Sequence, residues 1–241
     1  MEKIRQSGAI PTLVELGAKP SISEERGLAL LQPSDKVIFS PGISTAGFAE
    51  IRMAQQNPER RVIATTIDAG GMQYTSDLVR RVGLQSQIET KLEDLRGPWN
   101  HAPDSFDFIY ARLVLHYIST QDLDSTLQNF MRSLRPGGRL FAVVQSVKNI
   151  DPNDPNNKYD PETRLTSRVK YLTDGTIIGI GERYLQTPES FGEHVERAGF
   201  VLQSVQEYEE QLYHDYERTH EMIGPRPSQL IEIVAVKPAK A

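Results

Sequence analysis

The sequence contains no cysteine, and this absence excludes several kinds of chemistry. Disulfide bonds, thiolate metal sites and cysteine nucleophiles all require that side chain. The five histidines are scattered, and His214 and His220 are six positions apart, so a single helix would not present both on one face. We therefore predict no metal site.

Long apolar runs are absent as well. No stretch approaches the ~20 apolar residues that span a bilayer, and Met1 to Arg5 lead into no apolar segment typical of a secretory signal. We expect a cytoplasmic protein. The net charge of −5 comes from mixed signs, which argues against an extended basic face. The expected partner is a small molecule, not a nucleic acid or a membrane.

The length of 241 residues predicts a single domain over 1–241. From Val37 onward, strand-like and helix-like segments alternate, which is typical of a parallel sheet with helices on both faces. The expected fold is α/β, a Rossmann-like, doubly wound, seven-stranded and mostly parallel sheet with an antiparallel last strand. Within the core at 34–146, strands are expected at 36–40, 61–67, 87–92, 106–111 and 139–145, and helices at 46–56, 71–82 and 123–134.

The segments on either side of this core do not follow its regular alternation of strands and helices. Residues 1–33 hold two amphipathic patterns, at 4–16 and 23–31, which predict helices that cap a substrate or cover a sheet edge. In the insertion at 147–186, Asp174-Gly175 predicts a hairpin turn between strands at 165–173 and 176–183. In 187–241, Thr187-Pro188 begins a helix that Gly199 ends, and an antiparallel strand pair follows at 200–208 and 230–236.

The segment Val37 to Glu50 combines an apolar strand, a loop of small residues and the start of a helix, and Asp68 closes the next apolar run. This arrangement is typical of the nucleotide end of a Rossmann-like sheet, where a carboxylate at the second strand tip accepts ribose hydroxyls. The alternative role of Asp68 is to cap the following helix. The loop keeps only Gly42 and Gly47 where three closely spaced glycines are usual.

Five segments in order resemble the class I S-adenosylmethionine-dependent methyltransferases. In that family the first loop has an acid-x-Gly-x-Gly-x-Gly pattern, and its acid falls here on Ser40. The resemblance implies S-adenosylmethionine as cofactor. It also implies a first-loop contact through Ser40 and the three positions that align with the family's glycines, which are Gly42, Ser44 and Ala46. Ser40 lacks the carboxylate that binds the cofactor's ammonium group, and Pro41 removes one backbone donor.

The later segments extend the resemblance. Ile67-Asp68-Ala69-Gly70-Gly71-Met72 is similar to the family's second motif, and Ile88 to Leu95 to its third, in which an acid binds the adenine amino group. Asp104 to Tyr117 and Leu134-Arg135-Pro136-Gly137-Gly138 are similar to the fourth strand and to the turn into the fifth. The further cofactor-binding residues implied are Asp68, Ala69, Met72, Asp94 (or, one position earlier, Glu93), Leu95, Ala111 and Arg112.

His116 follows the fourth strand, where it would act as a general base or substrate contact, or as a packing residue under the N-terminal cap. Polar and aromatic side chains on the insertion and the last loop suit a substrate pocket, although an exposed hairpin also suits a homodimer contact. The expected substrate-binding residues are Tyr117, Tyr171, Arg183 and Tyr184, with Tyr159, Tyr213, His214 and Tyr216 as further candidates.

The resemblance implies methyl transfer to an oxygen or nitrogen atom of a small molecule. Two alternatives follow from the altered first loop: a methyltransferase-like binding or regulatory subunit without catalysis, and a protein that uses the cofactor for non-methyl chemistry. A nicotinamide dehydrogenase fits less well, since the Leu134-Arg135-Pro136-Gly137-Gly138 turn and the terminal strand pair resemble methyltransferases.

Overall fold

The main body of the molecule is a single seven-stranded sheet in the order β3-β2-β1-β4-β5-β10-β9. A computed structural model of the chain describes residues 21–43, 47–151, 153, 157–171, 177–212 and 226–239. Strands β1 to β5 run parallel, and β10 is antiparallel to both β5 and β9. The strands are β1 (Val37–Pro41), β2 (Arg61–Thr66), β3 (Ile88–Leu92), β4 (Phe106–Arg112), β5 (Leu134–Gln145), β9 (Val201–Leu212) and β10 (Arg226–Val236).

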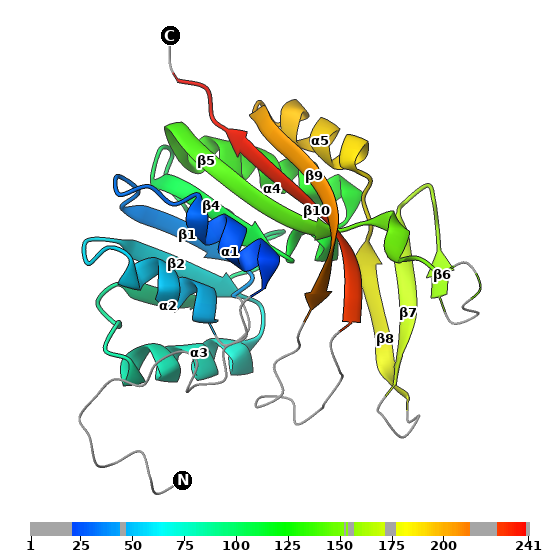
Figure 1. The fold of residues 1–241 in the computed structure, drawn as a ribbon, viewed down its shortest axis with the longest axis horizontal. Helices are drawn as coiled ribbons and strands as arrows, with labels where there is room; N and C mark the ends of the chain where they lie inside the picture. Colours follow the sequence, from blue (N-terminus) through cyan, green and yellow to red (C-terminus); the bar gives the residue numbers. More distant parts are fainter. Residues whose placement is uncertain are drawn as a thin grey trace, which may run out of the picture.

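Helices cover both faces of this sheet, as Figure 1 shows for α1 in front of the central strands and α4 behind them. One buried cluster packs α1, α2 and α3 on their face, and a second packs α4 and α5 on the other. The helices are α1 (Ile22–Ala29), α2 (Phe48–Gln55), α3 (Ala69–Arg81), α4 (Thr120–Ser133) and α5 (Pro188–Arg197), with short 3₁₀ turns η3 (Leu115–Tyr117) and η4 (Val147–Asn149). Within the described residues, no helix is long and apolar enough to cross a membrane.

The insertion forms a separate three-stranded antiparallel sheet beside the main one (Figure 1). It contains β6 (Asn157–Tyr159), β7 (Leu165–Tyr171) and β8 (Ile177–Tyr184). The predicted hairpin is therefore present, while its turn at Asp174-Gly175 and the expected helix at 4–16 lie outside the described residues. The short strand β6 was not predicted, because its Asn-Lys-Tyr sequence follows a proline- and asparagine-rich run typical of a loop.

The predicted fold class is confirmed, and most element boundaries agree within a few residues. Strand β5 is the clearest difference, since it begins at Leu134 and includes the predicted turn. Gly137 has a φ of 79°, its N–H donates to the Lys237 carbonyl, and the Lys237 N–H donates to the Gly138 carbonyl. The end of the chain thus supplies the hydrogen bonds that let this glycine-rich segment continue the ladder.

Candidate active site

The carboxyl ends of β1 and β4 mark the place where a ligand binds in a sheet of this topology, because strand order reverses between them. Gly42, just after β1, has a φ of 71°, and a Cβ there would lie 2.5 Å from Cγ2 of Val114. Only glycine fits this position without displacing Val114. The loops after β1 and β4 therefore pack together at this point. Ser44 and Ala46 lie outside the described residues.

Ser40 is buried near the end of β1 and does not face solvent. Its hydroxyl donates to Oε1 of Glu50 at 2.7 Å, and Glu50 is fully buried in the first turn of α2. A carboxylate therefore stands next to the position where the family's acid would be, although it comes from the following helix. The sequence signal for it was an acid within the otherwise apolar Phe48-Ala49-Glu50-Ile51, although the motif resemblance assigned Glu50 no role.

Asp68 lies at the N-cap position of α3, yet its side chain makes no capping hydrogen bond there. The Asp68 N–H donates to the Thr66 hydroxyl at the tip of β2, and the Asp68 side chain is exposed there. Ala69 and Met72 follow in the first turn of α3, exposed and half-buried respectively. The capping role that was the alternative for Asp68 is therefore absent.

Two apolar side chains that sequence reasoning missed lie at the same edge. Ile67 is 72% exposed after β2, and Leu92 is 53% exposed at the end of β3. Exposed apolar groups beside a carboxylate are the features of a site for a ring joined to a polar sugar. The only sequence signal was that each is the last residue of an expected strand.

The two acids that follow β3 both have protein partners. The Asp94 carboxylate accepts hydrogen bonds from Nε and Nη2 of Arg96, which hold the pKa of Asp94 below its usual value. Glu93 is 2.9 Å from Nε2 of His101. Leu95 has its side chain buried in the core. A ligand that used Asp94 would therefore share it with Arg96.

Arg112, at the end of β4, connects α1 to the far strands of the sheet. Its guanidinium donates to Ser23 and Ser21 at 2.7 and 2.6 Å and lies 3.5 Å from Glu210 of β9. Glu210 also accepts from the Ser23 N–H. Ala111 is fully buried before it. In this structure the Arg112 side chain thus anchors α1 over the sheet.

The structure brings His116, Tyr117 and Arg183 together. Tyr117 Oη accepts a hydrogen bond from Arg183 Nη2 at 3.2 Å, and the guanidinium lies 5.2 Å from the Tyr117 ring centre. The His116 and Tyr117 rings are 4.5 Å apart. Burial, followed by the charge of Arg183, holds the pKa of His116 well below 6.5, so its imidazole is neutral at pH 7.

The structure does not place the other predicted substrate residues in this group, because they point elsewhere or lie outside its described part. Successive side chains of a strand point to opposite faces, so Tyr184 faces away from the side of β8 that carries Arg183. Tyr171 belongs to β7 by its backbone, and its side chain is outside the described part. Tyr213, His214 and Tyr216 also lie outside the described residues.

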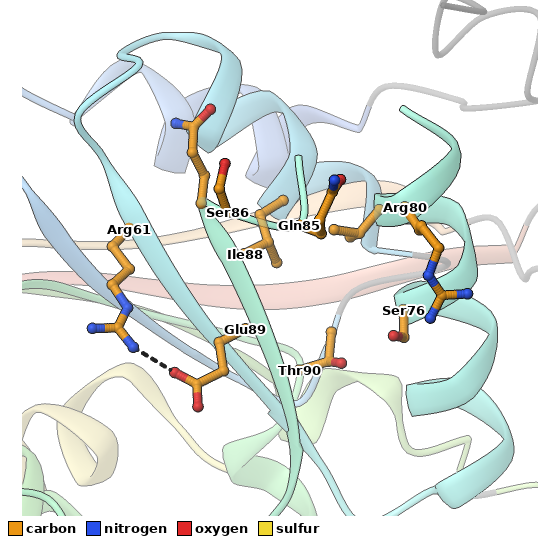
Figure 2. A pocket seen from close by; sticks show the side chains of 10 residues that line it. Arg61, Ser76, Arg80, Gln85, Ser86, Ile88, Glu89 and Thr90 are labelled. Carbon is orange, nitrogen blue, oxygen red and sulfur yellow. Dashed lines mark hydrogen bonds and ion pairs between the residues drawn. The ribbon is translucent and has the colours of Figure 1, made fainter. Parts of the chain in front are cut away.

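A separate pocket of about 380 Å³ lies between α3 and β3 (Figure 2). The ion pair of Arg61 and Glu89, at 2.9 Å, crosses one side of it, and Gln85 and Ser86 line another. Arg61 begins β2, whereas Asp68 follows its other end. This pocket is therefore away from the carboxyl edge and is not the candidate site.

Residues 41–142 match a family model described as a methyltransferase domain. This part of the chain is therefore similar to methyltransferase domains. An S-adenosylmethionine-dependent methyltransferase from Methanosarcina mazei has a similar structure, with a TM-score of 0.68, 17% identity, and coverage of 88% of this chain and 96% of that one. The [4+2]-cyclase SpnF is also similar, with a TM-score of 0.61, 16% identity, and coverage of 90% and 81%. At these identities the likeness shows the fold.

A curated relative matches over a short segment only. It is a polyketide synthase-nonribosomal peptide synthetase of Aspergillus clavatus, 52% identical over 42 residues, which are 17% of this chain and 1% of that protein. The chain thus matches only a very small part of that relative's length.

The described residues of the domain fit the adenosine part of S-adenosylmethionine. Asp68 has a carboxylate that does not cap its helix, and Ile67 and Leu92 supply exposed apolar surface on the adjacent strand tips. At the end of β1, the Ser40 hydroxyl and the Glu50 carboxylate are buried and hydrogen-bonded to each other.

Proposed function

We propose that the domain binds S-adenosylmethionine at the carboxyl edge of its sheet and transfers the methyl group to an oxygen or nitrogen atom of a small molecule. The observation that carries this proposal is the group at the tips of β2 and β3. There the Asp68 carboxylate, which does not cap α3, stands beside the exposed side chains of Ile67 and Leu92.

Each of these residues has a physical role in the proposal. The Asp68 carboxylate accepts hydrogen bonds from the two ribose hydroxyls, and Ile67 and Leu92 cover the adenine ring. The bound cofactor supplies an electrophilic methyl group. Transfer to an acceptor that is already nucleophilic requires alignment and the exclusion of water, so the neutral His116 serves to orient the acceptor.

The first test is calorimetric titration with S-adenosylmethionine and with its demethylated product. Asp68→Asn should weaken binding about tenfold, because it removes one charged hydrogen-bond acceptor. Asp77→Asn, on the exposed side of the same helix, is the matched control and should leave binding unchanged. If neither compound binds at ~1 mM, a dissociation constant equivalent to only ~4 kcal/mol, the proposal is wrong.

The second candidate function is cofactor binding with non-methyl chemistry. The absence of an acid at position 40 favours it, as does the similarity in fold to a protein described as a [4+2]-cyclase. Mass spectrometry of acceptor candidates separates the two functions. An added methylene mass supports transfer, whereas binding accompanied by an isomerised, unmethylated product supports the second function.

A further inference from the structure

Arg183 is a cation without an acidic partner among the described residues. Its side chain donates a hydrogen bond to Tyr117 Oη at 3.2 Å, and its guanidinium lies 5.2 Å from the centre of the Tyr117 ring. Its Nε is buried and has no hydrogen-bond partner in the part of the chain that the structure describes. A buried donor that is left unpaired costs about 1–3 kcal/mol, and more when the group is charged, so the site favours an acceptor atom at this position.

The neighbouring His116 adds a second unsatisfied atom to the same place. The residue is 2% exposed, and its Nδ1 has no partner within the described structure. Because the imidazole is neutral, the charge of the cluster comes from Arg183 alone. Two buried polar atoms without partners on adjacent side chains indicate a binding site that a ligand completes.

The cluster also stands next to the candidate cofactor site. Val114, which meets Gly42 at the switch point of the sheet, precedes η3 directly, and η3 contains His116 and Tyr117. Tyr117 is 53% exposed, so a ligand reaches the group from solvent past an aromatic ring.

We infer that Arg183, with His116 and Tyr117, binds an anionic oxygen group of the acceptor, so that the substrates are small carboxylic acids or acidic phenols. This inference rests on the proposed function for the adjacent cofactor. A guanidinium without an acidic partner attracts an oxyanion and repels the ammonium form of an amine, because the described residues of the site include no carboxylate to balance a second positive charge. Aromatic acids fit best, since the exposed Tyr117 ring offers a face for stacking.

The test uses three probes of similar shape and different charge: benzoate, benzamide and benzylamine. Binding to the full chain is followed by nuclear magnetic resonance titration at pH 7.5. Benzoate should bind at least about tenfold more tightly than either of the others, which corresponds to one charged hydrogen bond. Equal binding of benzamide, or no binding of benzoate at about 10 mM, would overturn the inference.

Variants separate a ligand site from a structural clamp. Arg183→Gln should lower benzoate affinity about tenfold or more, and Arg183→Lys should lower it less because the charge remains. Tyr117→Phe removes the hydrogen bond that holds Arg183 but keeps the ring, so benzoate affinity should change by no more than about threefold. If Tyr117→Phe and Arg183→Gln reduce binding equally, the cluster is a clamp and the inference is wrong.

Two controls complete the design. Arg81→Gln makes the same substitution at an exposed position on α3 and should leave benzoate binding unchanged. Titration of Arg183→Gln with the demethylated cofactor should match the unmodified chain, which also shows that the variant is folded.

Failure of cofactor binding with retained benzoate selectivity contradicts only the proposed function. Intact cofactor binding without charge selectivity contradicts only this inference.

Discussion

Ser40→Asp restores the acid of the family's first motif and is expected to destabilise this protein. The Ser40 hydroxyl lies 2.7 Å from a Glu50 oxygen, and both residues are buried. The substitution therefore places two carboxylates about 3 Å apart. At an effective dielectric of about 20, two negative charges at that distance repel by about 5 kcal/mol. Like charges so close cannot both remain ionised, so the pair binds one proton.

The free-energy cost of binding that proton gives a second estimate of the destabilisation. Protonating a carboxyl group of ordinary pKa, about 4, at pH 7.5 costs about 1.4 kcal/mol per pH unit, or about 5 kcal/mol. A hydrogen bond between the protonated and ionised carboxyl groups offsets part of it. We expect the free energy of unfolding to fall by about 3–5 kcal/mol at pH 7.5, a large share of the 5–15 kcal/mol that is typical of domains.

The pH dependence has a definite sign. The folded variant holds a proton that its unfolded chain releases above pH ~4, so its stability falls as pH rises from about 4 to 7.5. Urea unfolding at pH 5, 6 and 7.5 measures this, and the penalty should be about 3 kcal/mol smaller at pH 5 than at pH 7.5.

Two controls isolate the pair. Ser40→Ala removes only the donor, and should cost about 1.5–3 kcal/mol without the steep pH dependence. Combining Ser40→Asp with Glu50→Gln removes the second charge and should recover most of the stability at pH 7.5. A Ser40→Asp variant within about 1 kcal/mol of the parent at pH 7.5, or one whose penalty is the same at every pH, would refute the reasoning.

Two further predictions concern the centre of the sheet. Arg112→Gln removes the cation beside the buried Glu210 and the hydrogen bonds from Arg112 to Ser21 and Ser23. The free energy of unfolding, measured in urea, should therefore fall by about 3 kcal/mol. The control Arg81→Gln should change it by no more than about 0.5 kcal/mol. For His116, the pKa is depressed in the folded state, so the parent protein should lose stability as pH falls below 6.5, by up to about 1.4 kcal/mol per unit. His116→Gln should lack that contribution.

Each of these has a clear contrary result. A loss below about 1 kcal/mol for Arg112→Gln would mean that α1 is held by its apolar contacts alone. Parallel stability profiles for the parent and His116→Gln between pH 5 and 7 would mean that His116 titrates in the folded protein as it does in the unfolded chain.

Local patterns predicted the elements well because the forces that form them are local. The capping box at Thr187, followed by Pro188, begins α5 where expected. Alternating apolar segments with short connections predicted the parallel core and the antiparallel last strand. Strand β5 differed from the prediction. Its first residues have the sequence of a turn, and they extend the strand because the backbone of Lys237, about a hundred residues later, hydrogen-bonds to Gly137 and Gly138.

The candidate site was only partly predictable. Motif spacing located Asp68, and position after the fourth strand located His116. Sequence could not choose between capping and ribose binding for Asp68, because that depends on whether the side chain turns toward its own helix. Ile67 and Leu92 also escaped notice, since an apolar residue that closes a strand is ordinarily buried.

The sequence by itself determined the fold class and the places where loops leave the sheet, because both follow from periodicity and turn chemistry along the chain. It also determined the order of the segments that resemble methyltransferases. Tertiary structure alone decided that Ser40 is joined to Glu50, that Arg112 anchors α1, and that Arg183 meets His116 and Tyr117. These pairings join different elements of the fold, and their energies depend on distance and burial, which only the folded chain defines.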